Sequence, residues 1–170
     1  MLYVCPWHEV DVHVEDLEAT HVVSLLGVEG EPMRPAGIAN DRHLHLELDD
    51  IAGPIGGYVT PDAGHVDELL DFARAWDRAG PMIVHCYAGI SRSTAAALAI
   101  VCLYNPGQEE AAARQLRERA PFAQPNRRIL AIADEKLALE GRLVRAVEEL
   151  GPRPREATMG RLVELSVRLP

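Results

Sequence analysis

The sequence predicts an α/β fold in which a central, mostly parallel sheet is flanked by helices. Short apolar or β-branched segments alternate with longer segments of helical periodicity, which is the pattern of such folds. The chain has 170 residues, of which 48% are hydrophobic, enough for one domain with a sizeable core. We assign residues 1–150 to this domain. Residues 151–170, which begin with a Gly- and Pro-rich stretch, form a C-terminal extension.

Four segments have the composition of strands. Residues 2–5, 22–26 and 82–85 are short, largely apolar runs typical of buried strands, whereas residues 43–48 alternate leucines with polar residues and fit a half-buried strand. Residues 8–17 predict a short helix, although their alternating valines also fit a strand. A Gly-Pro-Ile-Gly-Gly stretch from residue 53 then predicts a loop.

The helices follow from N-terminal caps and apolar stripes. The Thr-Pro-Asp sequence at residues 60–62 fits a cap, a first helical residue and a first-turn acid. The apolar stripe behind it consists of Val66, Leu69, Leu70, Ala73 and Trp76. Residues 92–104 are apolar on nearly every side and predict a helix through the middle of the domain. Further helices are expected after Pro106, over residues 126–140 and over 143–150, and residues 161–169 form a separate tail element.

Charge and composition exclude several classes of function. The formal net charge is −9, which argues against nucleic acid as a partner, because such binding uses a basic surface. The longest apolar stretch, residues 95–104, is about half of a membrane span, so no membrane association is expected. No secretory signal is visible, and three cysteines fit free thiols in a reducing cytoplasm. His43 and His45 lack a third ligand nearby, so no metal site is predicted.

The segment that indicates chemistry lies between the predicted strand 82–85 and the predicted helix 92–104. Cys86 stands at the carboxyl end of the strand, where open α/β sheets place their sites. The five residues after it, with Gly89 in the middle, can curl so that successive N–H groups point at an anion. Arg92 offers a planar bidentate donor for phosphate oxygens, and the positive potential favours a thiolate at Cys86. The pattern therefore predicts attack of sulfur on a bound phosphate.

The Cys86-x5-Arg92-Ser93 sequence resembles the signature loop of the cysteine-dependent protein tyrosine and dual-specificity phosphatases, in a compact bacterial form. The resemblance extends over residues 40–130 and is most specific at 84–94. It implies a phosphatase that forms a phosphocysteine on Cys86, needs no cofactor and acts on phosphorylated protein, preferentially phosphotyrosine. By the same resemblance, Ser93 assists expulsion of the thiolate, and His85 tunes the cysteine and orders the loop. The phosphoryl oxygens would be bound by Tyr87, Ala88, Gly89, Ile90, Ser91 and Arg92.

Such a reaction needs a general acid, because a tyrosine phenolate with a pKa of about 10 leaves slowly unless it is protonated. The resemblance implies an aspartate on a loop before the cysteine. Asp50 fits that loop, since a small residue follows two positions later and a proline four positions later. Asp49 is the main competitor, and Asp41 and Asp62 are weaker ones.

Other functions remain open from the sequence. A rhodanese-type sulfurtransferase also has a cysteine in an anion-binding loop, but its loop usually has one residue fewer. An arsenate reductase would need a resolving thiol, and Cys102 lies about 15 Å beyond Arg92 along a helix. A catalytically silent phosphate-binding module is the non-enzymatic alternative. The loop interior carries no lysine, which disfavours inositol phospholipids as substrates.

Overall fold

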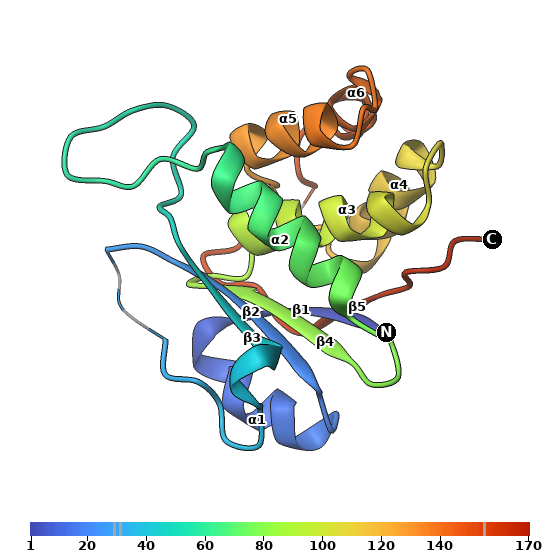
Figure 1. The fold of residues 1–170 in the computed structure, drawn as a ribbon. Helices are drawn as coiled ribbons and strands as arrows, with labels where there is room; N and C mark the ends of the chain where they lie inside the picture. Colours follow the sequence, from blue (N-terminus) through green and yellow to red (C-terminus); the bar gives the residue numbers. More distant parts are fainter. Residues whose placement is uncertain (29, 31, 155) are drawn as a thin grey trace.

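The computed structural model describes residues 1–28, 30, 32–154 and 156–170. Its backbone forms one sheet with helices on both faces (Figure 1). The strands are β1 (Leu2–Pro6), β2 (His21–Leu26), β3 (His43–Glu47), β4 (Met82–Cys86) and β5 (Val163–Leu165). The helices are α1 (Val10–Asp16), α2 (Ala63–Ala75), α3 (Arg92–Tyr104), α4 (Glu109–Arg119), α5 (Arg127–Lys136) and α6 (Arg142–Glu149). Two short 3₁₀ helices, η1 (Trp7–Glu9) and η2 (Asn40–Arg42), precede α1 and β3.

The strands are ordered β3-β2-β4-β1-β5 across the sheet. The first four are parallel, and β5 pairs antiparallel with the outer side of β1. The predicted α/β class with a mostly parallel sheet is therefore confirmed. Four carboxyl ends meet at one edge of the sheet, the edge at which ligands bind in open α/β sheets. At that edge, Cys86 of β4 is level with Leu25 of β2 and Pro6 of β1.

Burial follows the hydrophobic pattern of each strand. Every residue of β2 and β4 is buried, because helices cover both faces of the sheet at its centre. β3 lies at the edge and exposes His45 and Glu47 while burying Leu46, as the alternating pattern predicts. β5 likewise buries Val163 and Leu165 and exposes Glu164.

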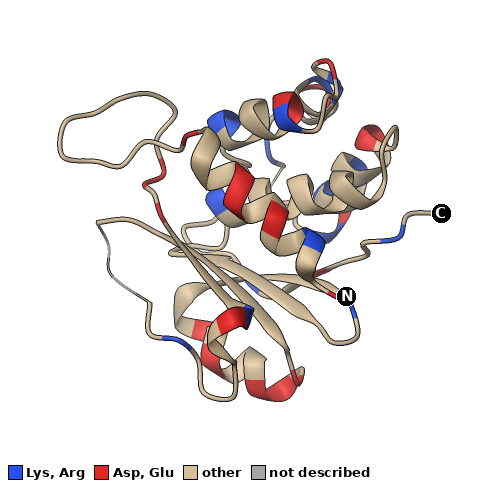
Figure 2. Ribbon diagram, in the orientation of Figure 1, with Lys and Arg blue, Asp and Glu red and all other residues tan. Residues whose placement is uncertain are grey.

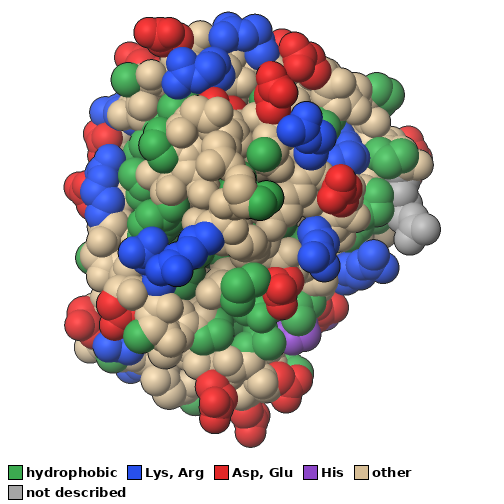
Figure 3. Space-filling view, turned by 90° about the vertical axis from the view of Figure 1, so that its right-hand side faces the viewer, with side chains coloured by type: hydrophobic (Ala, Val, Ile, Leu, Met, Phe, Trp, Pro, Cys, Tyr) green, Lys and Arg blue, Asp and Glu red, His purple; other side chains and the backbone are tan. Residues whose placement is uncertain are grey.

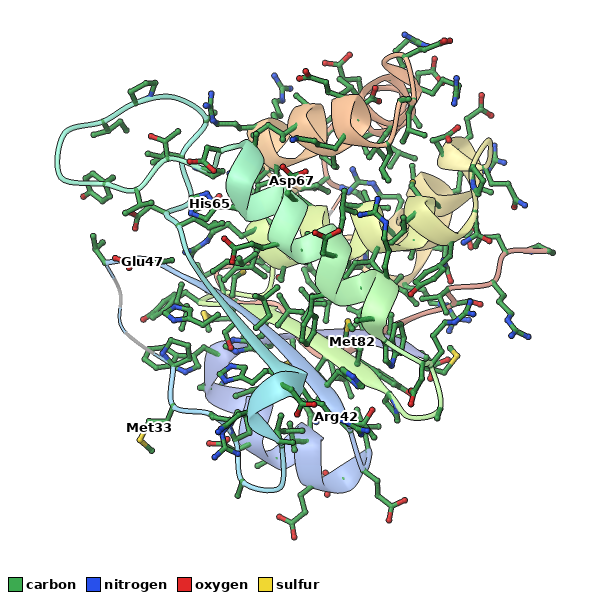
Figure 4. All side chains as sticks on the ribbon, in the orientation of Figure 1. Met33, Arg42, Glu47, His65, Asp67 and Met82 are labelled. Carbon is green, nitrogen blue, oxygen red and sulfur yellow. The ribbon has the colours of Figure 1, made fainter. Side chains whose placement is uncertain are left out.

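Two layers of helices enclose the sheet. α2 to α6 lie on one face and α1 on the other (Figure 1). Every residue of α3 from Arg92 to Cys102 is buried, which confirms the helix predicted through the middle of the domain. Residues 10–16 are helical, so the ambiguous valine pattern resolves as α1. Asp67 lies on the α5 side of α2 in Figure 4, where it accepts a hydrogen bond from Lys136 at 2.6 Å.

Two predicted helix boundaries were wrong. The helix predicted to begin at Pro61, after a Thr60 cap, begins at Ala63. The N-cap is Asp62, whose carboxylate accepts a hydrogen bond from the His65 N–H at 3.1 Å. The helix predicted to reach residue 140 ends at Lys136, since Ala138 and Glu140 both have a φ of 54°. A positive φ cannot continue a right-handed helix.

The charges are distributed unevenly over the fold. Acidic residues gather on α1 and along the outer face of α2, whereas α4 to α6 carry both signs (Figure 2). On the face seen in Figure 3, basic and acidic side chains are interspersed rather than separated. Within the described part of the chain, no helix is long and apolar enough to cross a membrane.

Candidate active site

Cys86 lies at the end of β4, in the lining of a cleft of about 480 Å³. The residue is only 1% exposed although it lines the cleft, so it lies at the bottom of the cleft. Of the loop residues proposed to bind phosphate, all but Gly89 line the same cleft: Tyr87, Ala88, Ile90, Ser91 and Arg92. The structure thus brings the predicted nucleophile and the predicted anion loop together.

Gly89 gives the loop its sharp turn. Its φ is +69°, in the left-handed region that glycine adopts without strain. A Cβ at this position would lie 2.7 Å from the backbone nitrogen of Pro6 and 2.8 Å from the backbone carbon of Cys5. Both the conformation and the close packing against the end of β1 therefore require glycine.

Arg92 and Ser93 enter the site from the first turn of α3. Arg92 is 3% exposed, and its Nη1 donates to the carbonyl of Leu48 at 3.0 Å, which fixes the guanidinium beside the cleft. The hydroxyl of Ser93 lies 3.1 Å from the sulfur of Cys86. A thiolate carries no proton, so the hydroxyl must be the donor whenever Cys86 is ionised. A hydroxyl at this distance would stabilise the charged form of the sulfur.

His85, which precedes Cys86 in β4, is buried and neutral. Burial lowers its pKa to about 3, and His43, His45 and Arg92 act in the same direction. Its Nε2 lies 2.6 Å from the hydroxyl of Ser24, which is in turn 2.8 Å from Nε2 of His43. At neutral pH, His85 therefore adds no positive charge next to Cys86. The contact with Ser24 joins β4 to β2, and the role of His85 in ordering the loop stays a prediction.

The two neighbouring aspartates have different surroundings. Asp50 is exposed, lines the cleft, and accepts hydrogen bonds on Oδ1 from Ser91 at 2.6 Å and Asn126 at 2.9 Å. Asp49 is 3% exposed, and its two oxygens accept from the backbone N–H groups of Val28 at 2.9 Å and Val59 at 2.6 Å. Asp50 thus faces the cleft that Cys86 lines, whereas Asp49 joins the segments that contain Val28 and Val59.

The two weaker candidates for the general acid lie elsewhere. Asp41 belongs to η2, which precedes β3 and so lies at the opposite edge of the sheet from the cleft. The carboxylate of Asp62 caps α2, and hydrogen bonding to the backbone of His65 lowers its pKa. Neither side chain is among those that line the cleft around Cys86.

The start of α5 and the segment before it supply a wall of the cleft that was not predicted from the sequence. Gln124, Asn126 and Arg127 line this wall. Asn126 also accepts from the first backbone N–H groups of α5, while its amide nitrogen donates to Asp50. An asparagine ahead of a helical pattern signals such a cap, but the contact with Asp50 spans 76 residues and has no local signal.

The other two cysteines lie in the core. Burial raises the pKa of the Cys5 thiol, and it raises the pKa of Cys102 to about 12. Cys102 belongs to the central helix α3, well beyond its first turn. Both thiols are therefore protonated at neutral pH and unreactive.

No family model matches the chain, and no curated protein sequence does. Among solved structures, the human tyrosine phosphatase-like serine/threonine/tyrosine-interacting protein matches with a TM-score of 0.63 at 21% identity, covering 82% of this chain and 92% of that one. DUSP15 matches with a TM-score of 0.64 at 23% identity over 89% and 93%. Human DUSP28 matches with a TM-score of 0.64 at 19% identity over 82% and 90%. The chain therefore has the fold of the tyrosine and dual-specificity phosphatases, as the resemblance of its loop implies.

Proposed function

We propose that the protein hydrolyses phosphate monoesters on protein substrates, preferentially phosphotyrosine, through a phosphocysteine intermediate. The observation that carries the proposal is the convergence of Cys86, Arg92 and Asp50 on one cleft. Cys86 and Arg92 come from the continuous β4–loop–α3 unit, and Asp50 comes from the separate segment after β3. The hydroxyl of Ser93, 3.1 Å from the sulfur, completes the set. Each group has the chemistry that one step of this reaction requires.

In the first step, the thiolate of Cys86 attacks the phosphorus, and a sulfur–phosphorus bond forms as the bond to the ester oxygen breaks. Arg92 and the N–H groups of residues 87–92 hold the phosphoryl oxygens. Asp50, in its protonated form, gives its proton to the departing oxygen. The dephosphorylated hydroxyl leaves as a neutral group, and Asp50 remains as a carboxylate.

In the second step, water attacks the phosphorus, and the sulfur–phosphorus bond breaks. The carboxylate of Asp50 takes the proton of the attacking water, so inorganic phosphate is released and the acid is restored. Cys86 leaves as a thiolate. The hydroxyl of Ser93 donates a hydrogen bond to the charge that develops on the sulfur, which is 3.1 Å away.

The cleft suits an aryl phosphate on a protein. Tyr87 is 48% exposed, lines the cleft and packs against Trp7 with ring centroids 6.3 Å apart, so an aromatic surface adjoins the anion loop. A phenyl ring gains contact area from such a surface. The loop interior carries no lysine that would hold additional phosphates, which argues against inositol phospholipids.

Two other functions are compatible with a cysteine in an anion loop: sulfur transfer of the rhodanese type and phosphate binding without turnover. One neighbour is named a tyrosine phosphatase-like serine/threonine/tyrosine-interacting protein. A shared fold at 21% identity does not by itself decide between turnover and binding. Cys86, Arg92 and Asp50 favour turnover, because a binding module needs neither the nucleophile nor the acid. Transfer of sulfur from thiosulfate to cyanide, without phosphatase activity, would establish the first alternative.

The test compares phosphotyrosine, phosphoserine and phosphoinositide substrates with the full chain and no added metal. We expect the phosphotyrosine peptide to be hydrolysed fastest. Cys86→Ser should bind inorganic phosphate but lose turnover, while Cys102→Ala, a change at a buried cysteine outside the site, should stay within a few-fold of the parent. Turnover of aryl phosphates by Cys86→Ser would contradict the thiolate mechanism.

A further inference from the structure

The C-terminal segment contacts the anion loop at Gly160. Its backbone N–H donates to the carbonyl of Ala88 at 2.7 Å. A Cβ on Gly160 would lie 2.8 Å from the carbonyl oxygen of Gly89 and 3.0 Å from that of Ala88. These are backbone atoms of the anion loop, so a side chain fits here only if the loop or the tail moves.

The direction of β5 explains how the tail reaches this point. β5 runs antiparallel to β1, with Val163 beside Val4 and Leu165 beside Leu2. It therefore begins at the edge where the parallel strands end, and Gly160, three residues earlier, lies at the same edge. Two contacts hold the tail just after Gly160: Glu164 accepts a hydrogen bond from the hydroxyl of Tyr3 at 3.0 Å, and the Cζ atom of Arg161 lies 5.9 Å from the ring centroid of Phe122.

The bond from Gly160 belongs to a set that turns the carbonyls of the anion loop outward. Four loop carbonyls accept backbone N–H groups at 2.7–3.2 Å: Tyr87 from Trp7, Ala88 from Gly160, Ile90 from Gln124, and Ser91 from Asn126. In a trans peptide, the carbonyl and the following N–H point in opposite directions. Holding these carbonyls outward therefore turns the N–H groups of residues 88, 89, 91 and 92 toward the inside of the loop.

We infer that Gly160 is a positioning residue for the anion site: it holds the Ala88–Gly89 peptide so that the Gly89 N–H points at the bound phosphoryl group. The C-terminal segment is then a structural part of the site rather than an appendage. This inference rests on the proposed function for the identity of the ligand, a phosphoryl group. The role needs a close backbone approach, which explains why the position is a glycine.

The experiment compares Gly160→Ala with Leu165→Ala in the full chain. Leu165 is 1% exposed in β5, so its truncation destabilises the tail without adding an atom near the loop. For Gly160→Ala, we expect the Kd for inorganic phosphate to rise about tenfold and kcat/KM to fall by about 10- to 100-fold. Complete loss of one oxyanion donor lowers the rate by about 10²–10³, and a misdirected N–H group should cost less. Leu165→Ala should lower Tm but keep both constants within about threefold of the parent. The backbone amide signal of Gly89 in ¹H–¹⁵N spectra should move on phosphate addition in the parent and Leu165→Ala, and much less in Gly160→Ala.

Full phosphate affinity and an unchanged Gly89 response in Gly160→Ala would overturn the inference. An equal loss of affinity in Leu165→Ala would also overturn it, because the tail would then act only through stability. Should Gly160→Ala fail to fold, the parent protein decides: the Gly160 amide signal must respond to phosphate, and a silent signal refutes the coupling. Failure of the proposed function is distinguishable, since a chain that binds phosphate in this Gly160-dependent way without hydrolysing any ester would overturn only the catalytic proposal.

Discussion

Replacing Asp50 with asparagine tests the proposed general acid with little change in shape. The amide oxygen can still accept from Ser91 and Asn126, which bind Oδ1 at 2.6 and 2.9 Å, but the side chain can no longer give a proton to the leaving oxygen. The variant therefore separates proton transfer from loop geometry. We expect Asp50→Asn to fold normally.

The size of the effect depends on the leaving group. Positioned acid catalysis contributes about 10²–10⁴ in rate, which corresponds to about 3–5 kcal/mol of transition-state stabilisation. A tyrosine phenolate has a pKa of about 10 and needs the full contribution. A nitrophenolate leaves more easily without a proton. Asp50→Asn should thus slow a phosphotyrosine peptide by about 10²–10⁴ and 4-nitrophenyl phosphate much less.

Asp49→Asn is the matched control. From the structure we expect it to lower the thermal stability and to leave the leaving-group dependence of the rate unchanged. Asp49 is buried and accepts one backbone N–H on each oxygen, from Val28 and Val59. An asparagine has one accepting oxygen, so one of these N–H groups would face an NH₂ group. A buried donor without an acceptor costs about 1–3 kcal/mol, so Tm should fall by several degrees while the leaving-group dependence stays as in the parent.

The assay measures kcat/KM for both substrates, together with Tm, for the parent and the two variants. The ratio of kcat/KM for 4-nitrophenyl phosphate to that for the phosphotyrosine peptide should rise in Asp50→Asn and stay as in the parent in Asp49→Asn. If the two variants exchange behaviours, the aspartates have been assigned in the wrong order. If neither variant changes the leaving-group trend, Asp50 is not the acid.

Three further predictions address other parts of the site. Arg92→Lys keeps the charge but loses the planar fork, so turnover should fall by orders of magnitude; a rate within a few-fold of the parent would exclude Arg92 as the phosphate clamp. Ser93→Ala removes the hydroxyl 3.1 Å from the sulfur, so rapid-quench kinetics should show slower breakdown of the phosphocysteine than formation. Burial lowers the pKa of His85 to about 3, from an unfolded value near 6.5, so the unfolded chain binds the extra proton and stability falls as pH drops between these values. Chemical denaturation measures the free energy of unfolding at each pH, and His85→Gln should lower its pH dependence by up to about 1.4 kcal/mol per pH unit. An unchanged pH dependence in the variant would show that His85 is not its source.

The sequence by itself determined the central part of the site. A buried strand, a short glycine-containing loop and a buried helix follow one another within 23 residues, from Met82 to Tyr104. Residues that are close together in the sequence set the geometry of this unit. Hydrophobic periodicity and Gly89 therefore suffice to predict where the strand ends and where the helix begins. The placement of Cys86 and Arg92 on one cleft could therefore be predicted, and the structure agrees.

Tertiary structure decided which distant residues join that unit. Asp49 and Asp50 are adjacent and chemically identical. Their surroundings differ because Asp49 accepts from the backbone of Val28 and Val59, whereas Asp50 accepts from the side chains of Ser91 and Asn126. The neutral state of His85 likewise comes from its burial in β4, the central strand of the sheet.

The contact of Gly160 with the loop depends on the antiparallel register of β5 against β1. Hydrophobic periodicity shows which face of a segment is buried, but the partner of that face is chosen by packing and strand pairing across the whole chain. The relative positions of Cys86 and Arg92 are determined by the strand, loop and helix that directly connect them. The contacts of Asp50, Asn126 and Gly160 form only once the sheet has formed.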